Sequence, residues 1–207
     1  ASTAGDTDGL TVFAVPKDAG QTADPRRLVD SALASKVTFD NVEVDADAVI
    51  GEVDGGWAVL TKLLDAGRVG AAAEMIGVGS AAMDMTVDYL KQRKQFGKLI
   101  GEFQALQHRA ADMLVALEQA RSMSFYAVQA ASDTDPNERR RGASAVKVQI
   151  GRSGRLIGQQ SIQLHGGIAM TMEYACGHYF KRLTMNDSLF GGADHHIRAL
   201  ADEGGLV

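Results

Sequence analysis

The chain has 207 residues, of which 45% are hydrophobic and 23% charged, with a net charge of −5 at pH 7. This is ordinary soluble globular composition, and its mixed charges disfavour nucleic acid as a partner, while no membrane span or signal peptide is expected. Cys176 is the only cysteine, so we expect no disulfide framework, no cysteine-based zinc site, and a reducing, cytoplasmic environment.

The N-terminal part of the chain has the β-branched content and the alternation of short strands. Residues 10–15 and 37–44 are predicted strands, the second of them half-buried, and a short apolar run at 49–51 follows them. Paired glycines at 55–56 then mark a break. Because two to four strands make a poor sheet alone, residues 1–54 are predicted to be the last strands of a β domain.

From Trp57 onward, apolar residues recur at the spacing of helices. A strong helix start lies at Asp135, which can cap a helix, with Pro136 in the first turn and Glu138 able to reach back. Long helices joined by short loops indicate a mainly α fold, a four-helix up-and-down bundle over residues 55–207. The first long helix is apolar or small nearly all round, so we expect it to be central and buried. The predicted helices are 57–92, 102–132, one that starts at 135–136 and stops near 166–167, 174–187 and 194–203.

Two motifs at predicted helix ends can bind a ligand. Arg93 ends the first long helix, and Phe96 follows it. A guanidinium suits a phosphate and an aromatic ring suits a flat ligand, although a cation here can also act as a cap. Gln163 precedes Gly166-Gly167, a pair that can simply end a helix or can let backbone amides approach a ligand.

Together, Arg-x-x-Phe-Gly and, some seventy residues later, Gln-x-x-Gly-Gly in a helical bundle after strands resemble the acyl-CoA dehydrogenase family. The resemblance extends from about residue 10 to the end of the chain. It implies that residues 1–54 are the second half of the family's middle β domain and that residues 55–207 are its C-terminal helical bundle. Further stretches that agree with the family are 39–44, 51–57, 64–68 and 89–93.

The resemblance implies an enzyme that contains flavin adenine dinucleotide (FAD), dehydrogenates an acyl-CoA thioester between its α- and β-carbons, and passes electrons to an electron-accepting flavoprotein. It also implies that FAD contacts cross a subunit boundary, so we expect a homo-oligomer (dimer or tetramer) or a heteromer with a homologous subunit. Asp65 and Arg68 are implied to line the acyl-CoA cleft. The residues implied to contact FAD are Arg93, Phe96, Gln163, Gly166 and Gly167, with Phe103 and Gln104 beside them.

The family's reaction needs a carboxylate that removes the α-proton. Most members carry a glutamate at the position of Phe190 or Gly191, and a minority carry it at the position of Gly67, but neither position holds an acid here. We expect the vacant positions to leave room for a bulky acyl group. The weaker candidates for the base are Glu74, Asp187 and Asp194, of which the first can instead pair with an arginine and the last can instead cap the final helix.

The missing carboxylate leaves two functions open. The first is an FAD-dependent acyl-CoA dehydrogenase with its base elsewhere, and the alternative is a non-catalytic partner subunit that completes the FAD site of another chain. Another flavin reaction, such as that of an oxidase, is a further alternative. His195 and His196 can act as bases near neutral pH, but neighbours on a helix point in two directions, so we expect no metal site there.

Overall fold

The computed structural model describes residues 7–204, and the chain divides into two compact units, one on each side of the boundary between residues 64 and 65. The sequence instead predicts a division after residue 54, just before the first helix begins at Gly56. That domain boundary stays a prediction, and we describe each unit by itself.

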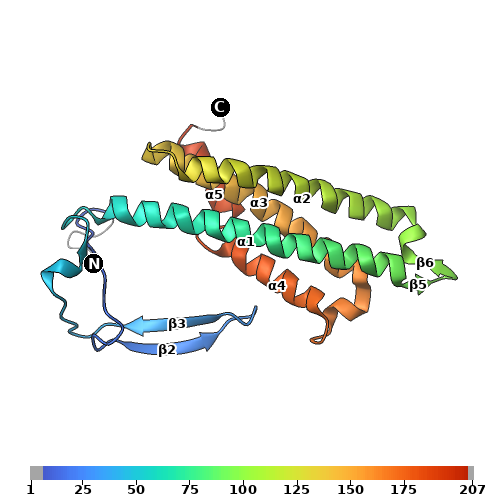
Figure 1. The fold of residues 1–207 in the computed structure, drawn as a ribbon, viewed down its shortest axis with the longest axis horizontal. Coiled ribbons are helices and arrows are strands. Elements are labelled where there is room, and N and C mark those ends of the chain that lie inside the picture. The colour runs from blue at the N-terminus through green and yellow to red at the C-terminus, as the bar shows by residue number, and fades with distance from the viewer. Residues whose placement is uncertain (1–6, 205–207) are drawn as a thin grey trace. The chain divides into compact units, whose positions relative to one another are not determined.

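The first unit contains two antiparallel strand pairs (Figure 1). Strand β1 (Val12–Phe13) pairs with β4 (Val49–Ile50), which follows a short 3₁₀ turn, η1 (Ala46–Ala48). Strand β2 (Thr22–Arg27) pairs with β3 (Leu33–Thr38), and every residue of both strands is exposed.

The prediction of a half-buried strand over residues 37–44 is wrong. Only residues 37 and 38 belong to a strand, the end of β3, and they are exposed. The physical reason is that the β2–β3 ribbon has only two strands, so alternate side chains have no packed layer beneath them. Strand β2 was not predicted, because its sequence TADPRR has neither alternation nor β-branched residues beyond its first position.

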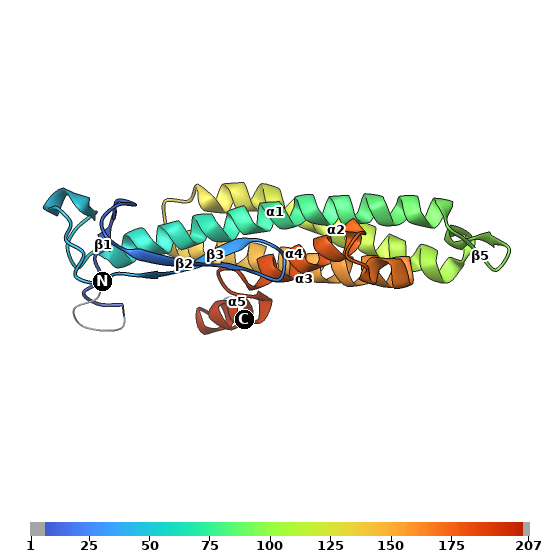
Figure 2. The same cartoon turned by 90° about the horizontal axis from the view of Figure 1, so that it is seen from below.

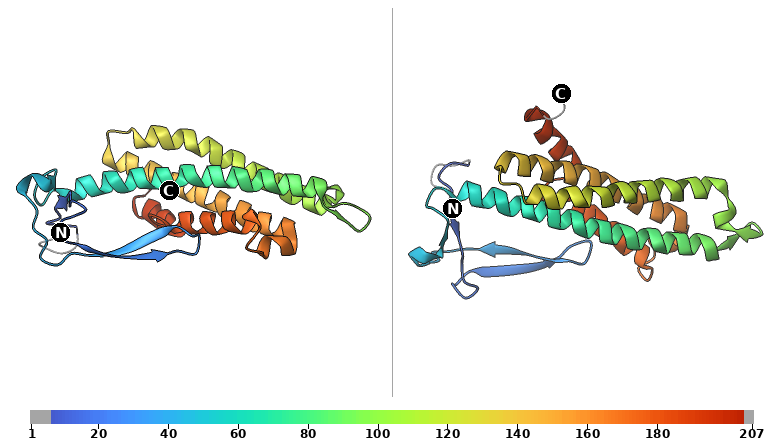
Figure 3. Two further views of the ribbon diagram at one scale, coloured as in Figure 1. Left: turned by 60° about the horizontal axis from the view of Figure 1, so that its bottom comes forward. Right: turned by 45° about the horizontal axis from the view of Figure 1, so that its top comes forward.

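The second unit is a helical bundle in which the first four helices alternate in direction (Figures 1 and 3), as an up-and-down bundle requires. The mainly α fold class is therefore confirmed. Each predicted helix is present, and no boundary differs by more than two residues. The helices are α1 (Gly56–Gln92), α2 (Gln104–Ala131), α3 (Pro136–His165), α4 (Ala175–Ser188) and α5 (Ala193–Asp202).

Helix α3 occupies the centre of the bundle and packs against α2, α4 and α5 (Figure 2). Its glycines stand where neighbours approach closely: a Cβ at Gly142 would collide with Ala130, and one at Gly151 would collide with Asp187. Helix α1, which was expected to be central and buried, contributes only one face to the core. On its other face a Cβ at Gly70 or Gly77 would meet nothing within 4 Å.

Two clusters of buried apolar side chains form the core of the bundle. Burial of these side chains is the main favourable term in folding. Unbranched methionines from several helices fill irregular gaps between them. The first cluster includes Met83, Leu90, Met113, Leu117, Ile157 and Leu164, and the second includes Met75, Ala120, Val146, Ile150 and Leu183.

Short elements connect the long helices at one end of the bundle. A hairpin of β5 (Lys94–Gln95) and β6 (Lys98–Leu99) follows α1, and the 3₁₀ turns η2 (Ile100–Glu102) and η3 (Gly166–Met170) precede α2 and follow α3. The hairpin turn has positive φ at both Phe96 and Gly97, which matches the twist of paired strands. Over residues 7–204, none of the helices combines the length and apolar character that crossing a bilayer requires.

Candidate cofactor and acyl-group sites

The two predicted ligand motifs meet at one end of the bundle. Tyr89, in the last turn of α1, packs against His165, the last residue of α3, with 4.6 Å between ring centroids. The β5–β6 hairpin and the turn after α3 therefore lie at the same end (Figure 3). This contact brings together segments that are about seventy residues apart in the sequence.

The hairpin exposes a cation and an aromatic ring. The backbone of Arg93 is held by hydrogen bonds to Tyr89 and Ile100, both at 2.9 Å, while its side chain is exposed. Within residues 7–204, no hydrogen bond or ion pair of the Arg93 guanidinium is found, so any capping of α1 by this cation acts through the helix dipole alone. Phe96 is 90% exposed, and its ring lies edge-on to that of Phe103 at 6.1 Å.

The glycine motif is open toward solvent. Gly166 adopts φ 65° and ψ −143°, a conformation essentially restricted to glycine. A Cβ at Gly166 or at Gly167 would meet nothing within 4 Å, so another molecule can approach this backbone. Gln163 and Gln104 are both exposed at this end.

The chemistry of these groups fits a dinucleotide cofactor. A guanidinium is suited to a diphosphate, a glycine backbone without side chains lets such a group approach, and the exposed ring of Phe96 is suited to a flat ring system. Arg93, Phe96 and the glycine backbone are open to solvent, whereas Phe103 is half-buried against the core of the bundle.

His165 is a buried residue of this end that the sequence did not single out. Its Nδ1 donates to the carbonyl of Ser161 at 2.8 Å and lies 3.5 Å from the sulfur of Cys176. Burial lowers the pKa of His165 and raises the pKa of the Cys176 thiol to about 11. The thiol is therefore protonated at neutral pH, and the pair has a structural role in joining α3 to α4.

The two positions at which the family carries its carboxylate meet in space. A Cβ at Gly67 on α1 would lie 2.8 Å from Cζ of Phe190, which follows α4. The ring of Phe190 therefore covers Gly67, and the expectation that these positions leave room is wrong. The physical reason is that Phe190, with φ 58°, turns its own ring into the space above Gly67.

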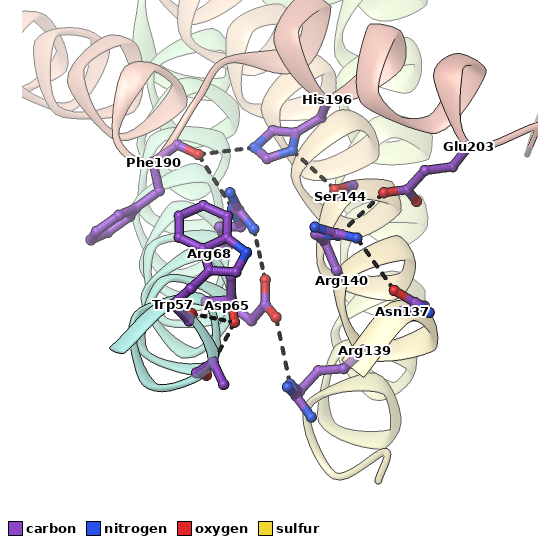
Figure 4. A network of polar contacts seen from close by, with 12 residues as sticks. Trp57, Asp65, Arg68, Asn137, Arg139, Arg140, Ser144, Phe190, His196 and Glu203 are labelled. Carbon is purple, nitrogen blue, oxygen red and sulfur yellow. Dashed lines mark hydrogen bonds and ion pairs between the residues drawn. The ribbon is translucent and has the colours of Figure 1, made fainter. Parts of the chain in front are cut away.

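A buried polar network holds this turn in place (Figure 4). The carbonyl oxygen of Phe190 accepts hydrogen bonds from Nε2 of His196 at 3.0 Å and from Nε of Arg68 at 3.4 Å. Nδ1 of His196 lies 3.1 Å from the hydroxyl of Ser144. Nε2 must donate to a carbonyl, and because burial lowers the pKa of His196 and keeps the imidazole neutral, Nδ1 accepts from Ser144.

His196 is consequently not available as a base. Burial, followed by the positive charge of Arg68, lowers the pKa of His196 to about 4. Both ring nitrogens are already engaged by neighbours. His195, in contrast, is exposed, but the two rings do not point apart as expected, because their centroids lie 5.1 Å from each other beside Gly191.

Asp65 and Arg68 lie within the same network. The carboxylate of Asp65 is 2% exposed and lies 2.7 Å from Nη1 of Arg68 and 3.5 Å from Nε of Arg139. Two guanidinium groups thus neutralise one buried carboxylate. This geometry gives Asp65 a role inside the bundle, and its predicted place in the acyl-CoA cleft stays a prediction.

The three weaker candidates for the base occupy different environments. Glu74 forms a bidentate ion pair with Arg182 of α4, with contacts of 2.5 and 2.8 Å. Asp187 is partly buried, and its Oδ1 has no hydrogen-bond partner in the part of the chain described. Asp194 is exposed in the first turn of α5, but the N-cap is Gly192, so the expected cap at Asp194 is wrong.

Lys147 is a second buried residue that the sequence did not single out. It lies on α3 with no exposed surface, and its Nζ donates to the carbonyls of Asn186 at 2.8 Å and Asp187 at 3.0 Å. These carbonyls belong to the last turn of α4, which lacks helical partners. Burial lowers the pKa of Lys147, and the nearby negative charge of Asp187 opposes that shift.

Comparisons with known proteins identify relatives for nearly the whole chain. A family model described as "Acyl-CoA dehydrogenase, C-terminal domain" matches residues 54–204. The short/branched chain specific acyl-CoA dehydrogenase, mitochondrial, of Bos taurus is 31% identical over 197 residues, which are 95% of this chain and 43% of that protein. The chain thus spans less than half the length of this relative.

Two solved structures show the same fold. The glutaryl-coenzyme A dehydrogenase glutaryl-CoA complex has a TM-score of 0.89 at 24% identity, covering 96% of this chain and 52% of that one. The Tcur3481–Tcur3483 steroid ACAD has a TM-score of 0.81 at 30% identity, covering 95% of this chain and 53% of that one. The arrangement of strands followed by a helical bundle is therefore that of these proteins.

Proposed function

The chain belongs to the acyl-CoA dehydrogenase family, and from this membership we propose that it is part of an FAD-dependent oxidoreductase that dehydrogenates an acyl-CoA thioester. The observation that carries the proposal is the meeting of the Arg93 hairpin and the Gln163 glycine motif at one end of the bundle. FAD, when bound, supplies the acceptor for the hydrogen that leaves the β-carbon with its electron pair. An electron-accepting flavoprotein would then take up those electrons.

The cofactor would be held by groups that this chain presents outward. The Arg93 guanidinium would pair with the diphosphate, and the backbone at Gly166 and Gly167 would approach the same group. Phe96 would contact a flat ring of the cofactor, with Phe103 and Gln104 beside it. These assignments are supported by the chemistry of the groups and by the exposure of Arg93, Phe96 and Gln104, while Phe103 is half-buried against the core.

We propose that the protein is an oligomer, in which a second chain would complete the site of the exposed cofactor groups. The proposal is supported by helix α2, which also exposes several large apolar side chains. A homo-oligomer, either a dimer or a tetramer, satisfies both requirements. A heteromer with a homologous subunit satisfies them as well, and one structural relative, the Tcur3481–Tcur3483 steroid ACAD, has a name that joins two proteins.

A second candidate function is favoured by the Phe190 ring over Gly67. In the first function the base is Glu74, Asp187 or Asp194, or it comes from elsewhere in the full-length protein. In the second function this chain is a non-catalytic partner subunit, and the carboxylate belongs to another chain. The apolar ring at both family positions of the carboxylate supports the second function.

The remaining assignments are proposals at the level of the whole protein. We assign residues 1–54 to the second half of a middle β domain and residues 55–207 to a C-terminal bundle domain. Arg68 and Asp65 are proposed to support the acyl-CoA side of the bundle. A cytoplasmic location is supported by the lone cysteine, Cys176, which is a buried free thiol as in proteins of reducing compartments.

The cofactor assignment is tested with an Arg93→Ala variant of the full-length protein. A charge-assisted hydrogen bond contributes about 1.5–3 kcal/mol, so we expect the affinity for FAD to fall about 10- to 100-fold. Flavin occupancy is read from the absorbance of the purified oligomer. Arg155→Ala is the matched control, since Arg155 is an exposed cation of α3. Equal occupancy in both variants would overturn the assignment.

The two candidate functions are separated by anaerobic bleaching of the flavin. A panel of acyl-CoA thioesters is added to the full-length protein alone and together with any partner that co-purifies. Bleaching by the protein alone supports an enzyme with its own base. Bleaching that requires a co-purifying homologous chain supports the partner-subunit function.

A further inference from the structure

The turn between α4 and α5 has a conformation that its own sequence does not favour. Phe190 and Gly191 both adopt positive φ, 58° and 98°. Glycine adopts such angles readily, whereas a bulky residue does so rarely. The surroundings must therefore hold Phe190 in place.

Two buried side chains bind carbonyl groups at this turn and just before it. Lys147 donates to the carbonyls of Asn186 and Asp187 in the last turn of α4. His196 donates to the carbonyl of Phe190 in the turn itself (Figure 4). Ser144 fixes the tautomer of His196 from the other side. Lys147, His196 and Ser144 are 0%, 1% and 3% exposed, so water does not compete for these hydrogen bonds.

The consequence of this support is the position of the Phe190 ring. It lies on α1 at Gly67, so close that a Cβ at Gly67 would be 2.8 Å away. The side chain remains 42% exposed, and it therefore offers one apolar face to a ligand. A phenyl ring fills space that a bulky ligand would otherwise occupy.

We propose that Phe190 is a specificity-determining residue that restricts this subunit's acyl-group site to slender acyl groups, and that Lys147 and His196 are its positioning residues. The inference rests on the proposed function, because it places the acyl group beside Gly67. Slender here means a straight chain. Polycyclic acyl groups are excluded by the ring.

The test uses the full-length protein with its FAD, titrated anaerobically with octanoyl-CoA and with cholyl-CoA, a thioester with four fused rings. Binding is read from the perturbation of the flavin absorbance and does not require turnover. For Phe190→Ala we expect the affinity for cholyl-CoA to rise about tenfold or more relative to octanoyl-CoA, a size typical of steric discrimination in a pocket. Phe190 is partly exposed, so this variant is expected to fold.

The positioning role is tested by Lys147→Met and by His196→Gln. Lys147→Met removes the hydrogen bonds that hold the turn. It is expected to raise the affinity for cholyl-CoA relative to octanoyl-CoA, as Phe190→Ala does. His196→Gln keeps an N–H donor near Nε2 and is expected to retain most of the wild-type preference. The matched control is Arg155→Met, which removes an exposed cation from α3, the helix that also carries Lys147. This variant is expected to leave the relative affinity for the two thioesters unchanged.

The outcomes separate the inference from the proposed function. If octanoyl-CoA perturbs the flavin and Phe190→Ala leaves the relative affinity for cholyl-CoA unchanged, the inference is overturned and the proposed function stands. If Lys147→Met and Arg155→Met behave alike, the positioning role is overturned. If FAD is bound but neither thioester perturbs it in any variant, both the acyl-CoA function and the inference are overturned.

Discussion

Several buried polar side chains in the bundle have a defined partner in the backbone, whereas both side-chain polar atoms of Asn186 have none among the described residues. Thr86 donates to the carbonyl of Ala82 at 2.6 Å, and Lys147 donates to the end of α4. Burial disfavours a charge. The pKa values of His165 and His196 are both lowered for this reason, and both histidines are neutral in the folded protein at pH 7.

The first prediction concerns the pH dependence of stability. Since the pKa of His196 falls from 6.5 to about 4 on folding, only the unfolded chain binds this proton between those values. The contribution of neutral His196 to the free energy of unfolding is therefore fully present above pH 6.5, and it is lost as the pH falls toward 4. The loss is at most about 1.4 kcal/mol for each pH unit. Urea unfolding of the full-length protein at pH 7.5, 5.5 and 4.5 measures it.

The matched variants for this prediction are His196→Gln and His195→Gln. We expect the first to flatten the pH dependence and the second, an exposed neighbour, to keep it. Some slope remains in His196→Gln, because the pKa of His165 is lowered in the same direction. Identical slopes in His196→Gln and the wild type would contradict the assignment.

At the scale of elements, the N-terminal ends of α3 and α5 are capped differently. Helix α3 begins as predicted: Oδ1 of Asp135 accepts a hydrogen bond from the N–H of Asn137 at 2.8 Å, and Pro136 occupies the first turn. Helix α5 has Gly192 as its N-cap, without a side-chain hydrogen bond. An acidic residue in the first turn, such as Asp194, interacts with the helix dipole only.

The second prediction compares these two starts. Asp135→Ala removes a side-chain cap and should lower the free energy of unfolding by about 1 kcal/mol. Asp194→Ala should lower it by only about 0.3–1 kcal/mol, because the carboxylate acts through the screened helix dipole. Thermal unfolding followed by circular dichroism ranks the two variants. A larger loss in Asp194→Ala than in Asp135→Ala would show that the cap is misassigned.

At the scale of the whole molecule, the outer face of α2 is unusually apolar for a surface that only contacts water. Monomeric proteins seldom expose large contiguous apolar patches. Among the large apolar side chains of α2, Phe125 has the largest exposed fraction, 79%. The exposed apolar side chains of this helix are Leu114, Val115, Phe125, Tyr126 and Val128.

The third prediction is that the full-length protein is an oligomer at micromolar concentration and that Phe125→Ser weakens it. Aromatic side chains dominate the energetics of interfaces, so we expect the dissociation constant to rise about tenfold or more. Gln129→Ser, one turn away on α2, is the matched control and should change the constant little. Sedimentation velocity measures the assembly. A monomeric wild type would contradict this prediction and the shared cofactor site together.

The sequence by itself determined the helices, their order and the family. Helix periodicity and start signals such as Asp135-Pro136 act within one or two turns of chain, so they can be recognised without tertiary contacts. The motifs at Arg93 and Gln163 were likewise visible, because each lies within a few consecutive residues. The absence of an acid at Gly67 and Phe190 is also a property of the sequence alone.

Only the tertiary structure decided what surrounds those positions. The ring of Phe190 covers Gly67, although the two residues are 123 positions apart in the sequence. Likewise, Glu74 pairs with Arg182, and Lys147 donates hydrogen bonds to the end of α4. Spacing along the chain does not encode such contacts, since they arise when helices pack and bury particular side chains. The exposed face of α1 has the same origin: composition predicts how apolar a helix is, but the neighbouring helices decide which of its faces they cover.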